Sequence, residues 1–147
     1  PTTPEGAWDV TCLLVQPTSD IVATDFDGDG KLEILTFSKF HGDTLAIWHE
    51  GQTRDRYEQV WCDPQKRSFL HALWAADLNG EKCAVIGNRK DGRDLLLVRY
   101  VDGEYTVDVI DHDLGPANCM VYRHDGSDYI VAAYRETDQL ALYKVVE

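Results

Sequence analysis

The chain has 147 residues, of which 44% are hydrophobic and 27% are charged, the composition of a globular domain with a buried core. Its formal net charge of −12 argues against nucleic acid and anionic membrane surfaces as partners, since both need clustered Lys and Arg, and it suits cation binding. No apolar run approaches the roughly 20 residues that insertion of a membrane helix requires.

Taken in chain order, short apolar segments separated by polar turns predict a series of β-strands. Expected strands cover residues 8–14, 21–24, 33–38, 44–49, 57–62, 70–74, 83–88, 94–100, 105–111, 128–134 and 139–145, with a further strand starting near Asn118. Several of the turns between them are Asp-Gly or Asn-Gly, and no segment has helical periodicity. The sequence therefore predicts an all-β fold.

The first of these turns is an acidic loop, Asp25-Phe26-Asp27-Gly28-Asp29-Gly30-Lys31-Leu32-Glu33. Its carboxylates stand at loop positions one, three, five and nine, an alternation that suits the six to eight oxygen ligands of Ca²⁺. An EF-hand needs a bidentate Glu at position twelve and a helix on each side, whereas position twelve here is Thr36 and the flanks are strand-like. The loop therefore predicts a structural calcium site between two strands.

Related turns recur along the chain and indicate an internal repeat of about 50 residues. Asp25, Asp77 and Arg123 hold equivalent positions that lie 52 and 46 residues apart. Four antiparallel strands in such a repeat make up one blade of a β-propeller. The expected blades are 19–62, 70–111 and 117–147, and segment 8–14, from the same or a neighbouring chain, is expected to close the third blade as its fourth strand.

These loops and repeats resemble the FG-GAP or VCBS repeats of calcium-binding β-propellers, such as the integrin α-subunit head and certain fungal lectins. The resemblance covers nearly the whole chain and implies the calcium ligands Asp25, Asp27, Asp29, the Lys31 carbonyl and Glu33. Only Asp77 and Asn79 match in the second repeat, and Arg123 replaces the first ligand in the third, so calcium is expected in the first repeat.

Family propellers have five to eight blades, which implies that this segment of about three is part of a longer propeller or that two copies assemble six blades. The resemblance slightly favours a secreted or cell-surface location.

In such blades, the face opposite the calcium loop would carry the ligand-binding candidates Lys39, His71, Arg89, Asn118 and Arg135. The three bases follow or end the second strand of each repeat and are suited to the carboxylate of an acidic sugar. His71, Arg89 and Arg135 are also the catalytic candidates, with His71 as a proton-transfer group. Two alternatives remain open: the arginines pair with nearby carboxylates, and His71 donates to a backbone carbonyl.

Tryptophan and cysteine residues each allow two interpretations. Trp48, Trp61 and Trp74 either stack against a sugar ring or pack between blades. Cys12, Cys62, Cys83 and Cys119 have no C-x-x-C spacing, which argues against a zinc site. They are expected to be free buried thiols, and a disulfide stays open.

Together these features predict a calcium-stabilised binding module for a carbohydrate or a protein partner. The alternative is part of a polysaccharide lyase or sugar dehydratase that works at the basic face. The sequence contains no G-x-S-x-G, H-E-x-x-H or P-loop motif, so it does not decide between binding and catalysis.

Overall fold

The computed structural model describes residues 6, 8–39 and 41–146, and this part of the chain forms eleven strands and no α-helix. The strands are β1 (Thr18–Thr24), β2 (Glu33–Ser38), β3 (Thr44–Glu50), β4 (Tyr57–Cys62), β5 (Ser68–Leu78), β6 (Glu81–Lys90), β7 (Leu95–Val101), β8 (Glu104–Asp111), β9 (Pro116–His124), β10 (Ser127–Tyr134) and β11 (Gln139–Lys144). A single 3-10 turn covers Arg135–Thr137. The prediction of an all-β fold is confirmed.

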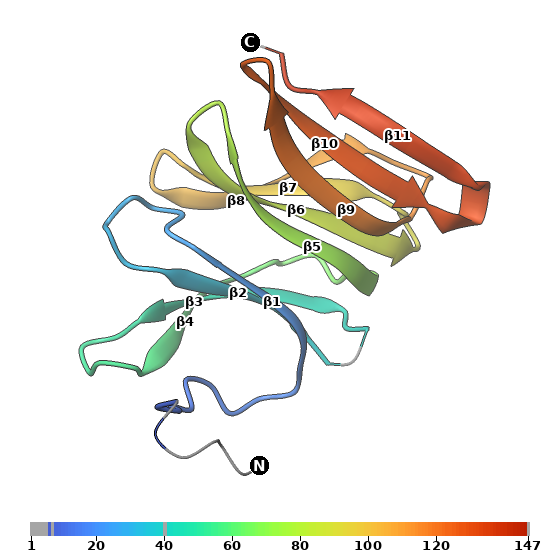
Figure 1. Cartoon of the computed structure of the whole chain (residues 1–147). Helices are drawn as coiled ribbons and strands as arrows, with labels where there is room; N and C mark the ends of the chain where they lie inside the picture. The colour runs from blue at the N-terminus through green and yellow to red at the C-terminus, as the bar shows by residue number, and fades with distance from the viewer. Residues whose placement is uncertain (1–5, 7, 40, 147) are drawn as a thin grey trace.

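The strands form three antiparallel sheets that follow one another along the chain (Figure 1). Their orders are β1-β2-β3-β4, β5-β6-β7-β8 and β11-β10-β9, so each sheet is a meander of consecutive strands. The described residues include no helix that is long and apolar enough to cross a membrane.

Two core layers hold the three sheets together, with the middle sheet between them. The first layer lies between sheets one and two and includes Leu35, Phe37, Ile47, Ile86 and Leu96, all of them fully buried. The second lies between sheets two and three and is formed by another set of buried side chains: Ala72, Leu78, Cys83, Val85, Leu95, Cys119, Ile130, Ala132 and Tyr134. Because both faces of the middle sheet are covered, the central part of β6 from Cys83 to Asn88 is continuously buried and mostly apolar.

A β-bulge recurs at the start of the first strand of each sheet. The extra, unpaired residues are Ser19 in β1, His71 in β5 and Ala117 in β9. They lie 52 and 46 residues apart, the spacing of the equivalent turn residues Asp25, Asp77 and Arg123. The three sheets therefore share the same bulge at the spacing of these turns.

The expected fourth strand of the third sheet is not formed among the described residues. Residues 8–14 make no strand and lie beside the first sheet, at the opposite end of the molecule from β11 (Figure 1). The other long edge of β11 is therefore unpaired within the described residues. The physical reason is distance: all three sheets separate the two segments that the prediction paired.

Candidate metal centre

The β1–β2 loop is held in a tight turn by its own carboxylates. Asp25 accepts hydrogen bonds from the backbone N–H groups of Gly28 at 2.8 Å and Gly30 at 3.1 Å. Gly28 and Gly30 have φ angles of 77° and 89°, a left-handed conformation that glycine adopts without strain. Asp27 accepts from the Asp29 amide and Asp29 from the Lys31 amide, so the loop is ordered by its own side chains.

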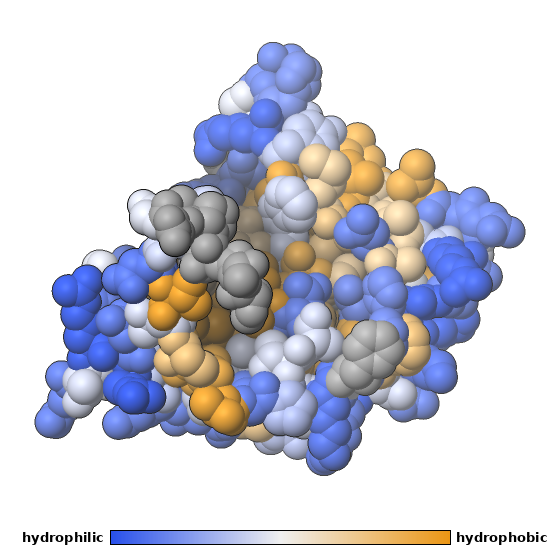
Figure 2. All heavy atoms as spheres, turned by 60° about the horizontal axis from the view of Figure 1, so that its bottom comes forward, coloured by the Kyte–Doolittle hydropathy of each residue, from blue (hydrophilic) through white to orange (hydrophobic). Residues whose placement is uncertain are grey.

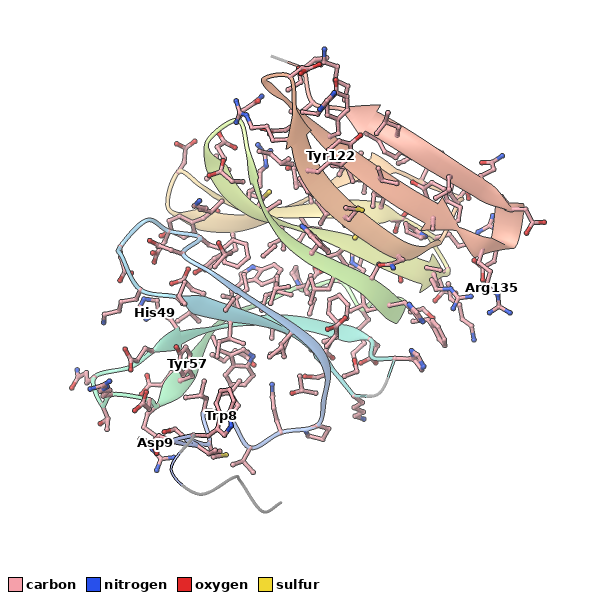
Figure 3. All side chains as sticks on the ribbon, in the orientation of Figure 1. Trp8, Asp9, His49, Tyr57, Tyr122 and Arg135 are labelled. Atoms are coloured by element: carbon pink, nitrogen blue, oxygen red, sulfur yellow. The ribbon has the colours of Figure 1, made fainter. Side chains whose placement is uncertain are left out.

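Four side chains converge at one end of the first sheet: Asp27, Asp29, Glu33 and His49. Each offers one ligand atom, and these atoms all lie within 4.8 Å of one another. The two aspartates come from the loop, Glu33 opens β2, and His49 projects from β3 (Figure 3). Pairing of β2 with β3, which places Ile34 opposite Trp48, brings His49 next to Glu33.

Glu33 is the most unusual member of the cluster because its side chain is fully buried. Its Oε2 accepts a hydrogen bond from the Phe26 amide at 2.6 Å, whereas its Oε1 has no hydrogen-bond partner among the described residues. Burial raises the pKa of Glu33 although the Phe26 amide opposes the shift, and the charge of Asp27 adds to the rise. A buried anionic oxygen without a donor calls for a cation.

His49 is oriented so that its Nε2 atom faces these carboxylates. Its Nδ1 lies 2.8 Å from the Glu50 carbonyl, which only accepts, so Nδ1 carries a proton. Its Nε2 lies 3.1 Å from Asp29 Oδ2 and 3.5 Å from Glu33 Oε1. Burial alone would lower the pKa of His49, but the Glu50 carbonyl and the two carboxylates together raise it. Either a proton on Nε2 or a metal ion shared with the carboxylates would complete this arrangement. Metal-ligating histidines commonly donate their other ring N–H to a carbonyl, as Nδ1 does here.

Not all of the expected ligands belong to the cluster. Asp27, Asp29 and Glu33 are in it, whereas both oxygens of Asp25 are engaged by the glycine amides and Asp25 lies outside it. Sequence reasoning missed His49, which stands 16 residues after Glu33 on another strand. The register of the β2–β3 hairpin could have revealed it. Ser38 pairs with Thr44, and counting away from the turn along both strands brings Glu33 next to His49.

In the other two sheets a side-chain cation pairs with a carboxylate at this turn, although acid and base exchange strands between them: Asp77 faces Lys82, whereas Arg123 faces Asp128. Lys82 Nζ lies 2.8 Å from Asp77 Oδ2 and holds the pKa of that carboxyl below its usual range. In the third sheet, Arg123 Nη1 lies 3.6 Å from Oδ1 of the buried Asp128. The first sheet has no lysine or arginine paired with its cluster among the described residues, which leaves His49 or a metal ion to supply positive charge.

The basic face differs from the metal cluster in that several of its groups already have partners. Arg89 is paired with Glu136, and its guanidinium lies 5.1 Å from the Phe69 ring centroid. His71 Nδ1 donates to the Ala117 carbonyl at 2.9 Å. Lys39, Asn118 and Arg135 are exposed at the same ends of their strands, with Arg135 on the opposite side of the molecule from His49 (Figure 3). Their roles in ligand binding and catalysis stay predictions.

The four cysteines are free thiols. Cys83 and Cys119 are buried, as expected, but Cys12 and Cys62 are exposed and correct the prediction that all four are buried. Cys12 belongs to the segment that forms no strand, and Cys62 ends the outermost strand of its sheet.

Comparisons with models of protein families and with curated proteins gave no match for this chain. What the site does therefore follows from its geometry: three carboxylates and one oriented imidazole around a buried oxygen that lacks a donor.

Proposed function

We propose that this chain is a calcium-stabilised binding module, built as three blades of a β-propeller, with a carbohydrate or a protein as its ligand. The observation that carries the proposal is the Oε1 atom of Glu33, buried without a hydrogen-bond partner inside a ring of ligand atoms. A cation at this point would neutralise the carboxylates and tie the β1–β2 loop to β3. Its role would be structural, because it would join segments of one sheet.

Calcium is favoured by the donors of the loop. Asp27, Asp29 and Glu33 offer carboxylate oxygens, and the flexible oxygen shell of Ca²⁺ has room for the Lys31 carbonyl and water. His49 supports a second candidate, Zn²⁺, because imidazole nitrogen is a ligand of softer ions. A His49→Ala variant separates the two: it should leave the calcium effect in place if oxygen atoms bind the ion, and should abolish a zinc effect.

The propeller assignment is supported by three consecutive meander sheets, their two core layers and the repeated bulge. A second copy, or further blades, would cover the free edge of β11. The lyase or dehydratase alternative gains no support from the basic face, since Arg89 is bound to Glu136 and His71 to the Ala117 carbonyl.

Thermal unfolding with Ca²⁺ and with EDTA tests the metal site. An ion at 100 times its dissociation constant adds about 2.7 kcal/mol of stability. At roughly 2–4 °C per kcal/mol for a domain of this size, Ca²⁺ should raise the Tm by roughly 5–10 °C. We expect no rise in Glu33→Gln, which keeps the shape of the side chain but removes its charge.

Glu58→Gln is the matched control, because Glu58 is exposed on β4 and outside the cluster. It should keep the full calcium effect. An equal calcium effect in wild type and Glu33→Gln, or none in wild type, would contradict the proposed site.

A further inference from the structure

A cleft of about 650 Å³ opens directly beside the metal cluster. One wall is formed by Asp27, Asp29 and His49 of the cluster, and another by Val60 and Trp61 of β4. The opposite wall comes from the β7–β8 hairpin of the second sheet, which lies on the same side of the molecule as the β1–β2 loop (Figure 1). The volume of the cleft falls within the range of small-molecule sites, about 300–1,000 Å³.

The cluster is closed at the back and open toward this cleft. Glu33 is fully buried behind it, while the Asp29 side chain is 40% exposed and lines the cleft. Four protein atoms fill only part of the six to eight positions around Ca²⁺. The remaining positions of an ion held here therefore face the cleft, where oxygen atoms of a bound molecule can replace water.

Aromatic side chains face the cluster across the cleft. Tyr105 lies at the centre of the group, with ring centroids 5.9 Å from Trp61 and 4.8 Å from Tyr100. All three are half-buried against the first core layer, which fixes their rings. Within the described part of the chain, the Trp61 indole N–H and the two tyrosine hydroxyls have no hydrogen-bond partner, so they remain able to bind a ligand.

Charge decides which kind of ligand suits such a site. Besides the cluster carboxylates, Glu104 lines the cleft, and no lysine or arginine does so. One divalent ion does not outweigh these acids, which disfavours an anionic ligand. A neutral sugar ring offers hydroxyl oxygens for the ion and an apolar face for the aromatic rings.

We infer that this cleft binds a neutral carbohydrate through the metal ion and the Trp61–Tyr100–Tyr105 wall. The inference rests on the proposed metal site and moves the ligand from the basic face to the calcium-loop face. The loop then has two roles, because the ion that stabilises the sheet also holds the sugar.

Binding to an array of neutral and acidic glycans, with the protein displayed as a tetramer to gain avidity, tests the inference. Calcium-loaded wild type should bind neutral glycans, and EDTA should abolish the signal. Val60 is an exposed cleft residue that belongs to neither the cluster nor the core layers. Val60→Trp fills the cleft and should lose glycan binding while keeping the calcium-induced rise in Tm.

Val109→Trp is the matched control. Val109 is 55% exposed on β8, against 52% for Val60 on β4, and it does not line the cleft. It should bind glycans as wild type does. If calcium raises the Tm but wild type binds no neutral glycan, or if EDTA or Val60→Trp leaves binding unchanged, the inference is wrong and the metal site stands. If calcium does not raise the Tm, the metal site itself fails and the inference with it.

Discussion

At the scale of single residues, Glu33 and His49 define the site because each has an atom whose hydrogen-bond partner is not supplied by the protein alone. Glu33 has a buried oxygen without a donor, and His49 has its only certain proton on the nitrogen that faces away from the acids. Because burial of an unpaired charge costs several kcal/mol, such a pair is stable only with a shared cation or an extra proton. Through these two residues, the stability of the folded state should depend on pH and on metal concentration.

The pH dependence of stability should reveal this link in EDTA. The folded-state pKa of Glu33 lies above its ordinary 4.5, so its protonated form favours folding, and this stability is lost as pH rises from 4.5 through the raised value. His49 acts in the same direction, since its raised pKa gives stability that is complete below 6.5 and is lost above it. In EDTA, the Tm of wild type should fall relative to Glu33→Gln as pH rises from 4.5.

Excess Ca²⁺ should remove this fall in Tm above pH 6.5, because the bound ion then neutralises the carboxylates in place of the protons. A constant Tm difference between wild type and Glu33→Gln in EDTA at all pH values would contradict the assignment of Glu33 as a buried acid.

Thiol reactivity provides an independent prediction about burial. Burial raises the pKa of Cys83 to about 12, with a further rise from Asp77, and burial raises that of Cys119 to about 12 as well. Since the thiolate is the reactive form, these two should stay unmodified in the native state, whereas the exposed Cys12 and Cys62 react. Titration with Ellman's reagent should detect two fast thiols before unfolding and four after it. Four fast thiols in the native protein would contradict the buried positions.

At the scale of elements, the three equivalent turns achieve charge balance in different ways. In the third sheet the buried Asp128 accepts a hydrogen bond from the Asn79 amide of the second sheet at 2.8 Å and lies near Arg123. This carboxylate therefore joins two sheets without a metal ion. The turn of the first sheet has a similar buried acid but relies on His49 or an added ion.

Asp128→Ala should lower the free energy of unfolding by about 1–3 kcal/mol, because the Asn79 amide loses its acceptor. Asp128→Asn keeps an acceptor oxygen and should cost less. Urea denaturation measures both, and the calcium-induced rise in Tm should persist in each. Equal stability of wild type and Asp128→Ala would show that the contact between the sheets is unimportant.

The sequence predicted the strands well because their signals are local. Turn residues mark both ends of β2 and β4, and the predicted ranges 33–38 and 57–62 coincide with these strands. His49 was missed because it joins the loop acids only through the pairing of β2 with β3. The closing strand was expected because residues 8–14 stand where a fourth strand would precede a first one, but this position along the chain does not say which sheet edge the segment can reach.

At the scale of the whole molecule, apolar side chains are exposed at both ends of the row of sheets. Leu140 and Leu142 on β11 are 77% and 59% exposed, and Val10 and Val15 near the N-terminus are 76% and 92% exposed. Apolar patches also interrupt the hydrophilic surface on the face that Figure 2 turns forward. An unpaired edge strand beside apolar surface is a site for pairing with another chain.

Light scattering after size-exclusion chromatography tests whether a second copy completes the fold. We expect a mass of twice the 16.6 kDa of one chain, with residues 8–14 of each copy paired to β11 of the other. Removal of residues 1–14 should return the mass to that of a single, shorter chain. A mass of 16.6 kDa at all concentrations would contradict this arrangement.

Equilibrium dialysis with Ca²⁺ tests whether the first sheet holds a calcium ion through its buried glutamate. Protein stripped with EDTA is dialysed against increasing Ca²⁺, and the bound ion is counted per chain. We expect one bound calcium per chain for wild type and Glu58→Gln, and none for Glu33→Gln. Wild type that binds no calcium, or Glu33→Gln that binds as much as wild type, would contradict this expectation.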